Sequence, residues 1–111
     1  MVTLSFRYKP NVKFDDSYYL FKHMAMAGEV MESLGIRHVE VQQALGEVSG
    51  GKPSYHVYTT LHFDSEEALH GCLASPVWKA AVEDIRNYYG ENPEFIVADV
   101  VWQASDEGMQ R

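Results

Sequence analysis

The chain has 111 residues, enough for one domain with a real core and too few for two. Its formal net charge of −7 argues against nucleic-acid binding, which needs a basic surface. No apolar run approaches the roughly 20 residues of a membrane span, and the chain does not begin with a signal-peptide pattern, so we expect a cytoplasmic protein. The single cysteine, Cys72, rules out an intrachain disulfide, and its apolar neighbours predict a small buried side chain rather than a reactive thiol.

The first half of the chain predicts a strand, a helix and a second strand. Apolar and polar residues alternate over Val2–Tyr8, which indicates a strand. Asp15 or Asp16 can cap a helix that stops at Gly35. At about 100° per residue, the apolar stripe of this helix would consist of Leu20, Met24, Ala27, Met31 and Leu34. Alternation resumes over residues 36–46, which predicts the second strand.

The second half predicts another strand, two helices and a last strand. Residues 46–53 form a loop, and the alternation over Ser54–Asp64 indicates a strand. The segment Asp64-Ser65-Glu66-Glu67 can cap a short helix, with its first carboxylate facing the helix amides. Ser75-Pro76 starts a further helix, because serine is a good cap and proline suits the first helical position. Phe95–Trp102 forms the last strand.

The resulting order, β-α-β-β-α-β, predicts an α+β protein of the ferredoxin-like class. Such a protein has a four-stranded antiparallel sheet with both helices on one face. We expect residues 1–102 to form this domain. Residues 103–111 are polar and have no periodicity, which predicts a flexible tail.

The sheet face without helices predicts association. The last strand is apolar on both sides, with Val97 and Val101 on one and Val100 and Trp102 on the other. In a monomer one of these sides would expose a sizeable apolar patch to water. A two-fold axis that brings two such sheets together would cover it, so we expect a homodimer in which the two sheets form a dimeric α/β barrel. A monomer with a solvated open face is the alternative.

A candidate ligand site centres on the first helix. His23 falls about 60° from the apolar stripe, on the flank of Tyr19, and should be half-buried at the seam between helix and sheet. A histidine at this place can act as an acid or a base near neutral pH. Arg7 can bind an anionic or enolate oxygen, and Tyr19, His56 and Tyr58 can hydrogen-bond a small ligand. The alternative is that His23 is a packed histidine bonded to a backbone carbonyl.

The other histidines do not predict a metal site. His56 and His62 share a strand face but lie roughly 20 Å apart. If the hairpin is symmetric, His38 lies opposite or near His62 with Glu40 one step along, and these are ligand types for zinc or iron. A slip of one residue would separate them. We therefore expect no metal and, because phosphate-binding glycine signatures are missing, no organic cofactor.

Several short segments resemble the EthD family of the dimeric α/β-barrel superfamily. These segments are Phe14-Asp15, Tyr19, Lys22-His23-Met24, Gly35-Ile36, Glu40-Val41, Tyr55, Leu61-His62-Phe63-Asp64-Ser65, Ala68 and Ala74-Ser75-Pro76. The resemblance spans residues 2–102 and implies the ferredoxin-like fold and a dimer. It also matches His23 to the histidine of the family's Lys-His-Met segment.

For activity, the resemblance implies only a broad class. The namesake of the family is associated with bacterial degradation of ethyl tert-butyl ether beside an oxygenase system, and superfamily relatives include isomerases, monooxygenases, dehydratases and haem-degrading enzymes. We therefore expect an EthD-like enzyme that acts on a small apolar or aromatic oxygenated metabolite by acid–base or oxidative chemistry. One alternative is a non-catalytic binding or accessory protein of an oxygenase-type degradation pathway. Another is a haem or metal binder that uses His23 or the pair of His38 and His62.

Overall fold

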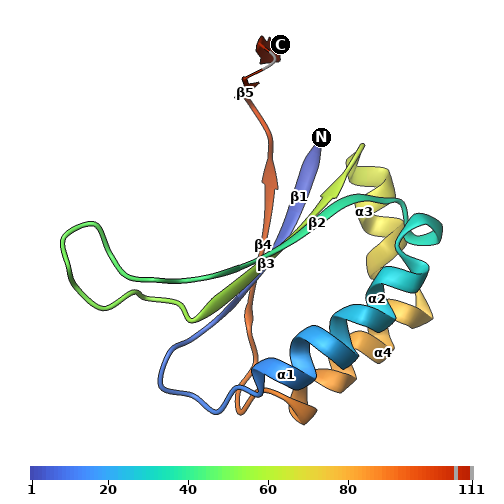
Figure 1. Ribbon diagram of the computed structural model, residues 1–111. Helices are drawn as coiled ribbons and strands as arrows, with labels where there is room; N and C mark the ends of the chain where they lie inside the picture. Colours follow the sequence, from blue (N-terminus) through green and yellow to red (C-terminus); the bar gives the residue numbers. More distant parts are fainter. Residues whose placement is uncertain (107, 111) are drawn as a thin grey trace.

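The computed structural model describes residues 1–106 and 108–110, and its main sheet has four strands with helices against one face (Figure 1). The strands are β1 (Val2–Tyr8), β2 (Ile36–Gln43), β3 (Val57–Phe63) and β4 (Glu94–Asp99). They lie in the order β2-β3-β1-β4, and each neighbouring pair is antiparallel. This arrangement confirms the predicted ferredoxin-like fold. A separate two-stranded sheet pairs β5 (Gln103–Ser105) with β6 (Gly108–Gln110).

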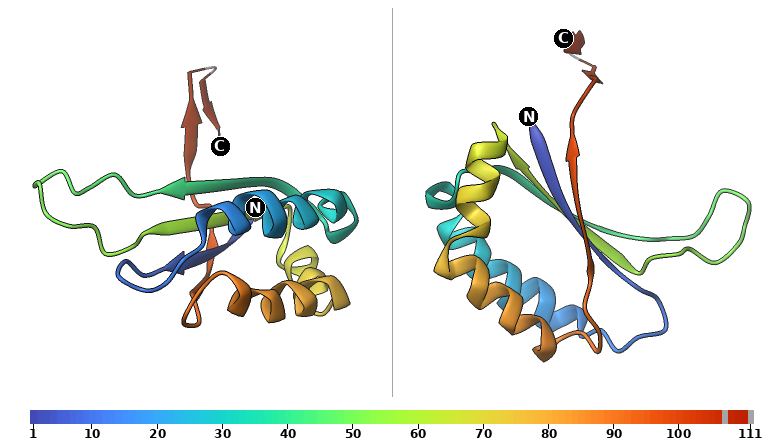
Figure 2. Two further views of the ribbon diagram at one scale, coloured as in Figure 1. Left: turned by 60° about the horizontal axis from the view of Figure 1, so that its bottom comes forward. Right: turned by 180° about the vertical axis from the view of Figure 1, so that it is seen from behind.

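The helices form two runs that cover the same face of the sheet, as the views in Figure 2 show from two further sides. The first run consists of α1 (Asp16–Tyr18), the π-helical turn η1 (Tyr19–His23), α2 (Met24–Val30) and the 3₁₀ turn η2 (Glu32–Leu34). The second consists of α3 (Glu66–Leu73), α4 (Pro76–Asp84) and the 3₁₀ turn η3 (Ile85–Asn87). Within the described residues, no helix has the length and apolar character needed to cross a membrane.

The helix starts follow the predicted capping chemistry with one difference. Asp15 and Ser75 accept backbone amide hydrogen bonds at the starts of α1 and α4, as predicted. At α3 the cap is Ser65 rather than the preceding aspartate. The carboxylate of Asp64 instead meets the side chain of Arg37, with Oδ2 2.7 Å from Nε.

The strands end earlier than predicted at two places. β2 ends at Gln43 and β3 begins at Val57, so residues 44–56 form a long loop that projects from the sheet (Figure 1). β4 ends at Asp99 rather than at Trp102. Beyond it, β5 and β6 pair with each other where a flexible tail was predicted, because a local hairpin can satisfy backbone groups without an apolar periodicity.

The π-helical turn changes which side chains of the first helical run face the sheet. At the end of η1 the backbone N–H of Met24 bonds to the carbonyl of Tyr19, five residues earlier. This turn therefore contains one residue more than an α-helical turn, and the core position one turn before Met24 falls to Tyr19 instead of Leu20. Tyr19 is 1% exposed and Leu20 is 46% exposed. The predicted stripe is thus wrong at Leu20, because it assumed about 100° per residue throughout.

The two faces of the main sheet differ in chemistry. On β1 and β3 the face towards the helices carries the buried side chains of Val2, Leu4, Phe6, Tyr8, Val57, Thr59, Leu61 and Phe63. The opposite, open face is polar on β1, β2 and β3 and includes Ser5, Arg7, His38, Glu40, Gln42, Tyr58, Thr60 and His62.

The exposed apolar residues near the end of the main sheet lie on the edge strand β4 and just beyond it. Val97 pairs with Leu4, which places it on the helix-facing side of the edge strand β4, where it is still 55% exposed. Val101 and Trp102 follow the end of β4 and are 88% and 66% exposed. Ile96 pairs with Ser5 and so lies on the open face, whereas Val101 and Trp102 follow the end of the edge strand. The apolar surface belongs to the edge of the sheet.

Candidate functional site

His23 forms a close pair with the carboxylate of Asp84. His23 ends η1 and Asp84 ends α4, so the pair joins the two helical runs. Nδ1 of His23 lies 2.9 Å from Oδ2 of Asp84, and only 7% and 17% of the two side chains are exposed. Since a carboxylate accepts, Nδ1–H donates, and Nε2 carries the lone pair of the neutral ring. The hydrogen bond to Asp84 thus engages Nδ1 and leaves Nε2 as the nitrogen that can accept a proton.

Two further donors hold the carboxylate of Asp84 in place. The hydroxyl of Tyr18 donates to Oδ1 at 2.7 Å, and the amide nitrogen of Asn87 donates to the same oxygen at 2.8 Å. Burial by itself raises the pKa of Asp84, but the hydrogen bonds from Asn87, His23 and Tyr18 outweigh it and bring the pKa below its ordinary value. Asp84 is therefore charged at neutral pH and fixes the orientation of the imidazole ring.

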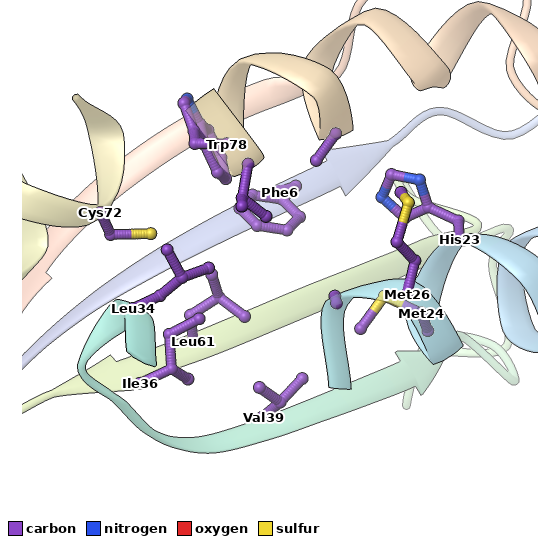
Figure 3. A pocket seen from close by; sticks show the side chains of 13 residues that line it. Phe6, His23, Met24, Met26, Leu34, Ile36, Val39, Leu61, Cys72 and Trp78 are labelled. Carbon is purple, nitrogen blue, oxygen red and sulfur yellow. The ribbon is translucent and has the colours of Figure 1, made fainter. Parts of the chain in front are cut away.

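His23 lies at one end of a cavity between the sheet and both helical runs (Figure 3). Its apolar lining includes Phe6, Met24, Met26, Leu61 and Trp78. Apart from the buried thiol of Cys72, His23 is the titratable side chain among the lining residues. The cavity volume is about 50 Å³, which is less than the ~150 Å³ that holds benzene in a protein core. A ligand the size of benzene requires the cavity to widen. Methionine side chains lie beside the imidazole in Figure 3, and such side chains can change conformation to make room.

Buried aromatic residues support the ring of His23. Tyr19 stacks on it with ring centroids 5.5 Å apart, and Tyr88 packs at 4.8 Å with tilted planes. The hydroxyl of Tyr19 hydrogen-bonds to that of Thr59, and the hydroxyl of Tyr88 lies 2.7 Å from that of Tyr8. Burial raises the pKa of Tyr19 to about 12. These hydroxyls are therefore neutral at physiological pH, and their hydrogen bonds hold the aromatic support in place.

Two of the predicted ligand-binding residues, Arg7 and Tyr58, lie on the open face of the sheet and so away from His23. Nη1 of Arg7 is 3.2 Å from the hydroxyl of Tyr55 and 3.9 Å from a carboxylate oxygen of Glu94. Tyr58 sits opposite Arg7 in the pairing of β1 with β3. These two residues therefore do not share the cavity.

His56, the third of these residues, lies just before β3. Its Nε2 is 2.9 Å from Oδ1 of Asp16, near the start of α1. Of the four predicted ligand-binding residues, the structure brings only Tyr19 together with His23. The sheet separates Arg7 and Tyr58 from the cavity, and His56 lies at the start of β3.

Sequence reasoning missed Asp84 and expected a different setting for His23. The histidine is buried instead of half-buried, and its partner is a carboxylate, whereas the alternative interpretation gave it a backbone carbonyl. The extra residue of η1 accounts for the deeper position. A signal for Asp84 was present, because helical spacing places it on one face with Val77, Ala81 and Tyr88. A carboxylate on an otherwise apolar helix face calls for a buried partner.

The structure brings His38 and His62 together, which the sequence left open because it depends on the register of the hairpin. The two residues are directly paired between β2 and β3, and their ring centroids are 5.1 Å apart. Nε2 of His38 lies 3.7 Å from Oε2 of Glu40. Among the residues that the structure describes, no group of three or more His, Cys, Asp or Glu side chains is arranged to hold a metal ion.

No protein-family model and no curated protein matches the chain. Among solved structures, it is similar to an EthD-like protein from Ralstonia eutropha JMP134, with 24% identity over 95% of this chain and 96% of that one and a TM-score of 0.78. A candidate antibiotic biosynthesis monooxygenase from Deinococcus radiodurans is 14% identical over 90% and 92% of the two chains, with a TM-score of 0.59. A dimeric ferredoxin-like protein of unknown function from Jannaschia sp. CCS1 is 13% identical over 89% and 98%, with a TM-score of 0.63.

These similarities place the chain in the ferredoxin-like α+β fold class that EthD-like proteins share. The predicted resemblance is thereby confirmed at the level of the fold. What the fold does in this chain depends on its own side chains.

Proposed function

We propose that the chain is an EthD-like enzyme that binds a small apolar or aromatic oxygenated molecule in the cavity, where His23 is the acid–base group. The observation that carries this proposal is the contact of Asp84 with Nδ1 of His23, because it orients the ring of a residue that lines an apolar cavity and leaves Nε2 as the proton acceptor. The similarity in fold to a candidate monooxygenase supports oxidative chemistry on a small molecule as one form of this activity.

The pair of His23 and Asp84 suits proton transfer. The neutral ring takes a proton at Nε2 from a ligand, and the carboxylate 2.9 Å from Nδ1 stabilises the imidazolium that forms. The same ring then returns the proton to the product. A positioned group of this kind contributes about 10² to 10⁴-fold in rate.

The lining of the cavity favours an uncharged ligand. None of its lining residues is a lysine or an arginine, so a carboxylate or phosphate would be buried without a counter-charge. A hydroxyl group can donate a hydrogen bond to Nε2 of the neutral His23 ring, and a carbonyl oxygen can accept one once that nitrogen is protonated. The ligand class is therefore a small apolar body with one neutral oxygen.

A binding experiment tests the role of His23 with two matched probes. 4-Methylphenol and toluene have the same apolar ring and methyl group, and only the first carries a hydroxyl. We expect the wild-type chain to bind 4-methylphenol more tightly in NMR titrations, and we expect His23→Ala to abolish the difference. His70→Ala is the control, because His70 is exposed on α3 and does not line the cavity. An unchanged preference in His23→Ala would contradict the proposal.

An exchange experiment tests acid–base catalysis without a known substrate. A base near a bound ketone removes a proton from the carbon next to the carbonyl, so deuterium from the solvent enters 2-indanone. We expect the wild-type chain to accelerate this exchange and His23→Ala to lose about 10²-fold or more of the acceleration. Equal acceleration by His23→Ala and wild type would remove His23 from the mechanism.

A non-catalytic binding or accessory protein is the second candidate function. The observation that favours it is the small volume of the cavity, about 50 Å³, which leaves little room for a substrate to move. Binding of 4-methylphenol through His23 without any acceleration of exchange would support this second candidate.

We also propose that two copies of the chain associate through the edge of the sheet. β4 has a neighbouring strand on one side only, and Val97, Val101 and Trp102 are 55%, 88% and 66% exposed. An unpaired edge with exposed apolar side chains is a template for pairing with another chain. A protein of the same fold from Jannaschia sp. CCS1 is described as dimeric, which supports a homodimer here.

Light scattering after size-exclusion chromatography tests this association. We expect a dimer mass for the wild-type chain and a monomer mass for the double variant Val97→Asp, Trp102→Asp. Phe21→Asp is the matched control, since Phe21 is 75% exposed on the first helical run, away from β4. A dimer that survives the double variant would place the interface elsewhere.

A further inference from the structure

His38 and His62 form a histidine pair on the open face of the sheet. They occupy opposite positions in the pairing of β2 with β3, so their side chains leave the sheet on the same side. The ring centroids are 5.1 Å apart and the ring planes are inclined by 62°. A register irregularity between Ile36 and His38 sets this alignment. The pair lies on the face opposite to His23 and is independent of the cavity.

The geometry of the pair suits a shared metal ion. Metal–nitrogen bonds to histidine are about 2.0–2.1 Å long, so the two coordinating nitrogens have to come within about 4 Å of each other. Directly opposite residues have Cβ atoms about 4.5–5.5 Å apart, which brings two imidazoles into this range by rotation of the side chains. The side chain of His38 is 61% exposed and can turn without disturbing the core.

The surroundings of the pair are favourable for a cation. Oε2 of Glu40 lies 3.7 Å from Nε2 of His38, on the same face of β2. The ladder places Thr3 beside His62 and Thr60 beside Glu40, so uncharged side chains occupy these neighbouring positions.

We propose that His38 and His62 together bind one divalent transition-metal ion on the open face of the sheet. Glu40 supplies a nearby carboxylate, and water fills the remaining coordination positions. Such a site keeps coordination positions open to water, in contrast to the closed four-ligand sites that hold structural zinc. The affinity should follow the order Mn²⁺ < Co²⁺ < Ni²⁺ < Cu²⁺, because imidazole sites obey this general series.

Copper provides the sharpest test. Titration of the full-length chain with Cu²⁺ in a non-coordinating buffer, followed by calorimetry, should give one ion per chain. The electron paramagnetic resonance spectrum should show splitting from two nitrogen ligands. We expect His38→Ala to bind at least about tenfold more weakly and to show one nitrogen, and we expect the double variant His38→Ala, His62→Ala to lose the site.

Three controls keep the test decisive. His70→Ala and His56→Ala should bind Cu²⁺ as the wild type does, because both residues lie outside the pair. Circular dichroism should confirm that each variant is folded, and His38→Ala, which changes an exposed side chain, serves if the double variant is not. The proposal is overturned if the folded double variant or His38→Ala binds Cu²⁺ as tightly as the wild type. It is also overturned if the wild type shows no saturable binding up to about 1 mM Cu²⁺.

Discussion

Nδ1 of His23 and Oδ2 of Asp84 lie 2.9 Å apart although 61 positions separate the two residues in the chain. Asp84 stands in the last turn of α4, where the helix dipole disfavours a negative charge by about 0.3–1 kcal/mol. Three side-chain donors, from His23, Tyr18 and Asn87, offset that cost. A negative charge at the C-terminal end of a helix, held there by a buried histidine, is typical of functional sites, where side chains are often placed at a cost to stability.

Removal of the Asp84 carboxylate should destabilise the fold. Asp84→Ala leaves three donors without their acceptor, which costs about 1–3 kcal/mol in the free energy of unfolding. Urea denaturation measures this cost. Glu83→Ala, at an exposed neighbouring position on α4, should change the free energy by no more than about 0.5 kcal/mol. Equal stability of the two variants would show that the hydrogen bonds around Asp84 contribute nothing.

The same carboxylate should shape stability at low pH. The pKa of Asp84 is lower in the folded chain than in the unfolded chain. The ionised carboxylate therefore stabilises the fold fully at pH values above its unfolded pKa, and this stabilisation is lost as the pH falls through its folded pKa. The free energy of unfolding should therefore decline less steeply in Asp84→Asn than in the wild type below about pH 4. Glu83→Gln removes a negative charge from the same helix and should decline like the wild type. Parallel curves for Asp84→Asn and wild type would contradict the lowered pKa.

Because of the π-helical turn, the adjacent residues Tyr19 and Leu20 should contribute very differently to the stability of the fold. Tyr19→Ala should cost about 3–5 kcal/mol in the free energy of unfolding, because Tyr19 is 1% exposed in the core. Leu20→Ala should cost about 0.5 kcal/mol or less, since Leu20 is 46% exposed. Chemical denaturation of both variants measures the difference. A larger cost at Leu20 would mean that the helix keeps α-helical phase through this region.

His62 should titrate at a lower pH than an ordinary histidine. Burial is the largest cause of its lowered pKa, and the charge of His38 adds to it. NMR titration of the imidazole signals should show this midpoint, and His38→Gln should raise it part of the way, because the burial remains. His70→Gln is the control and should leave the midpoint of His62 unchanged. An unchanged His62 midpoint in His38→Gln would show that the two rings do not interact electrostatically.

Cys72 should react slowly with thiol reagents in the folded chain. Its side chain is 2% exposed, and burial raises the pKa of the thiol, which keeps the reactive thiolate scarce. Reaction with Ellman's reagent should accelerate when urea unfolds the chain. Rapid reaction in the absence of urea would show that the cavity lining opens readily to solvent.

Much of the fold was predictable because it depends on local patterns. The alternation of Val2–Tyr8 marked β1 with its observed bounds, and Ser75 marked the start of α4. Such features need only the periodicity of strands and the chemistry of caps. The pairing of His38 with His62 remained open at the level of sequence, since a slip of one residue in the hairpin register would separate them.

The candidate site was less predictable because it depends on departures from regular geometry. His23 was identified, but its depth and its carboxylate partner were not, since the π-helical turn changes the phase of the helix without an obvious sequence marker. Arg7, His56 and Tyr58 were grouped with it by residue type, and the structure places them elsewhere. Strand parity does not say which face a helix covers or where an edge strand ends.

The extra residue in η1 has a consequence for how chains of this architecture diversify. Deletion of one residue within 20–22 would convert the turn to regular α-helix, because η1 holds one residue more per turn than an α-helix. Tyr19 would still lie one turn before Met24 and His23 directly before it, so the pair of His23 and Asp84 would stay in place. Residues 20–22 are exposed, so the core would lose no side chain. Chains of this architecture can therefore differ in length by one residue at this turn and keep the same cavity wall.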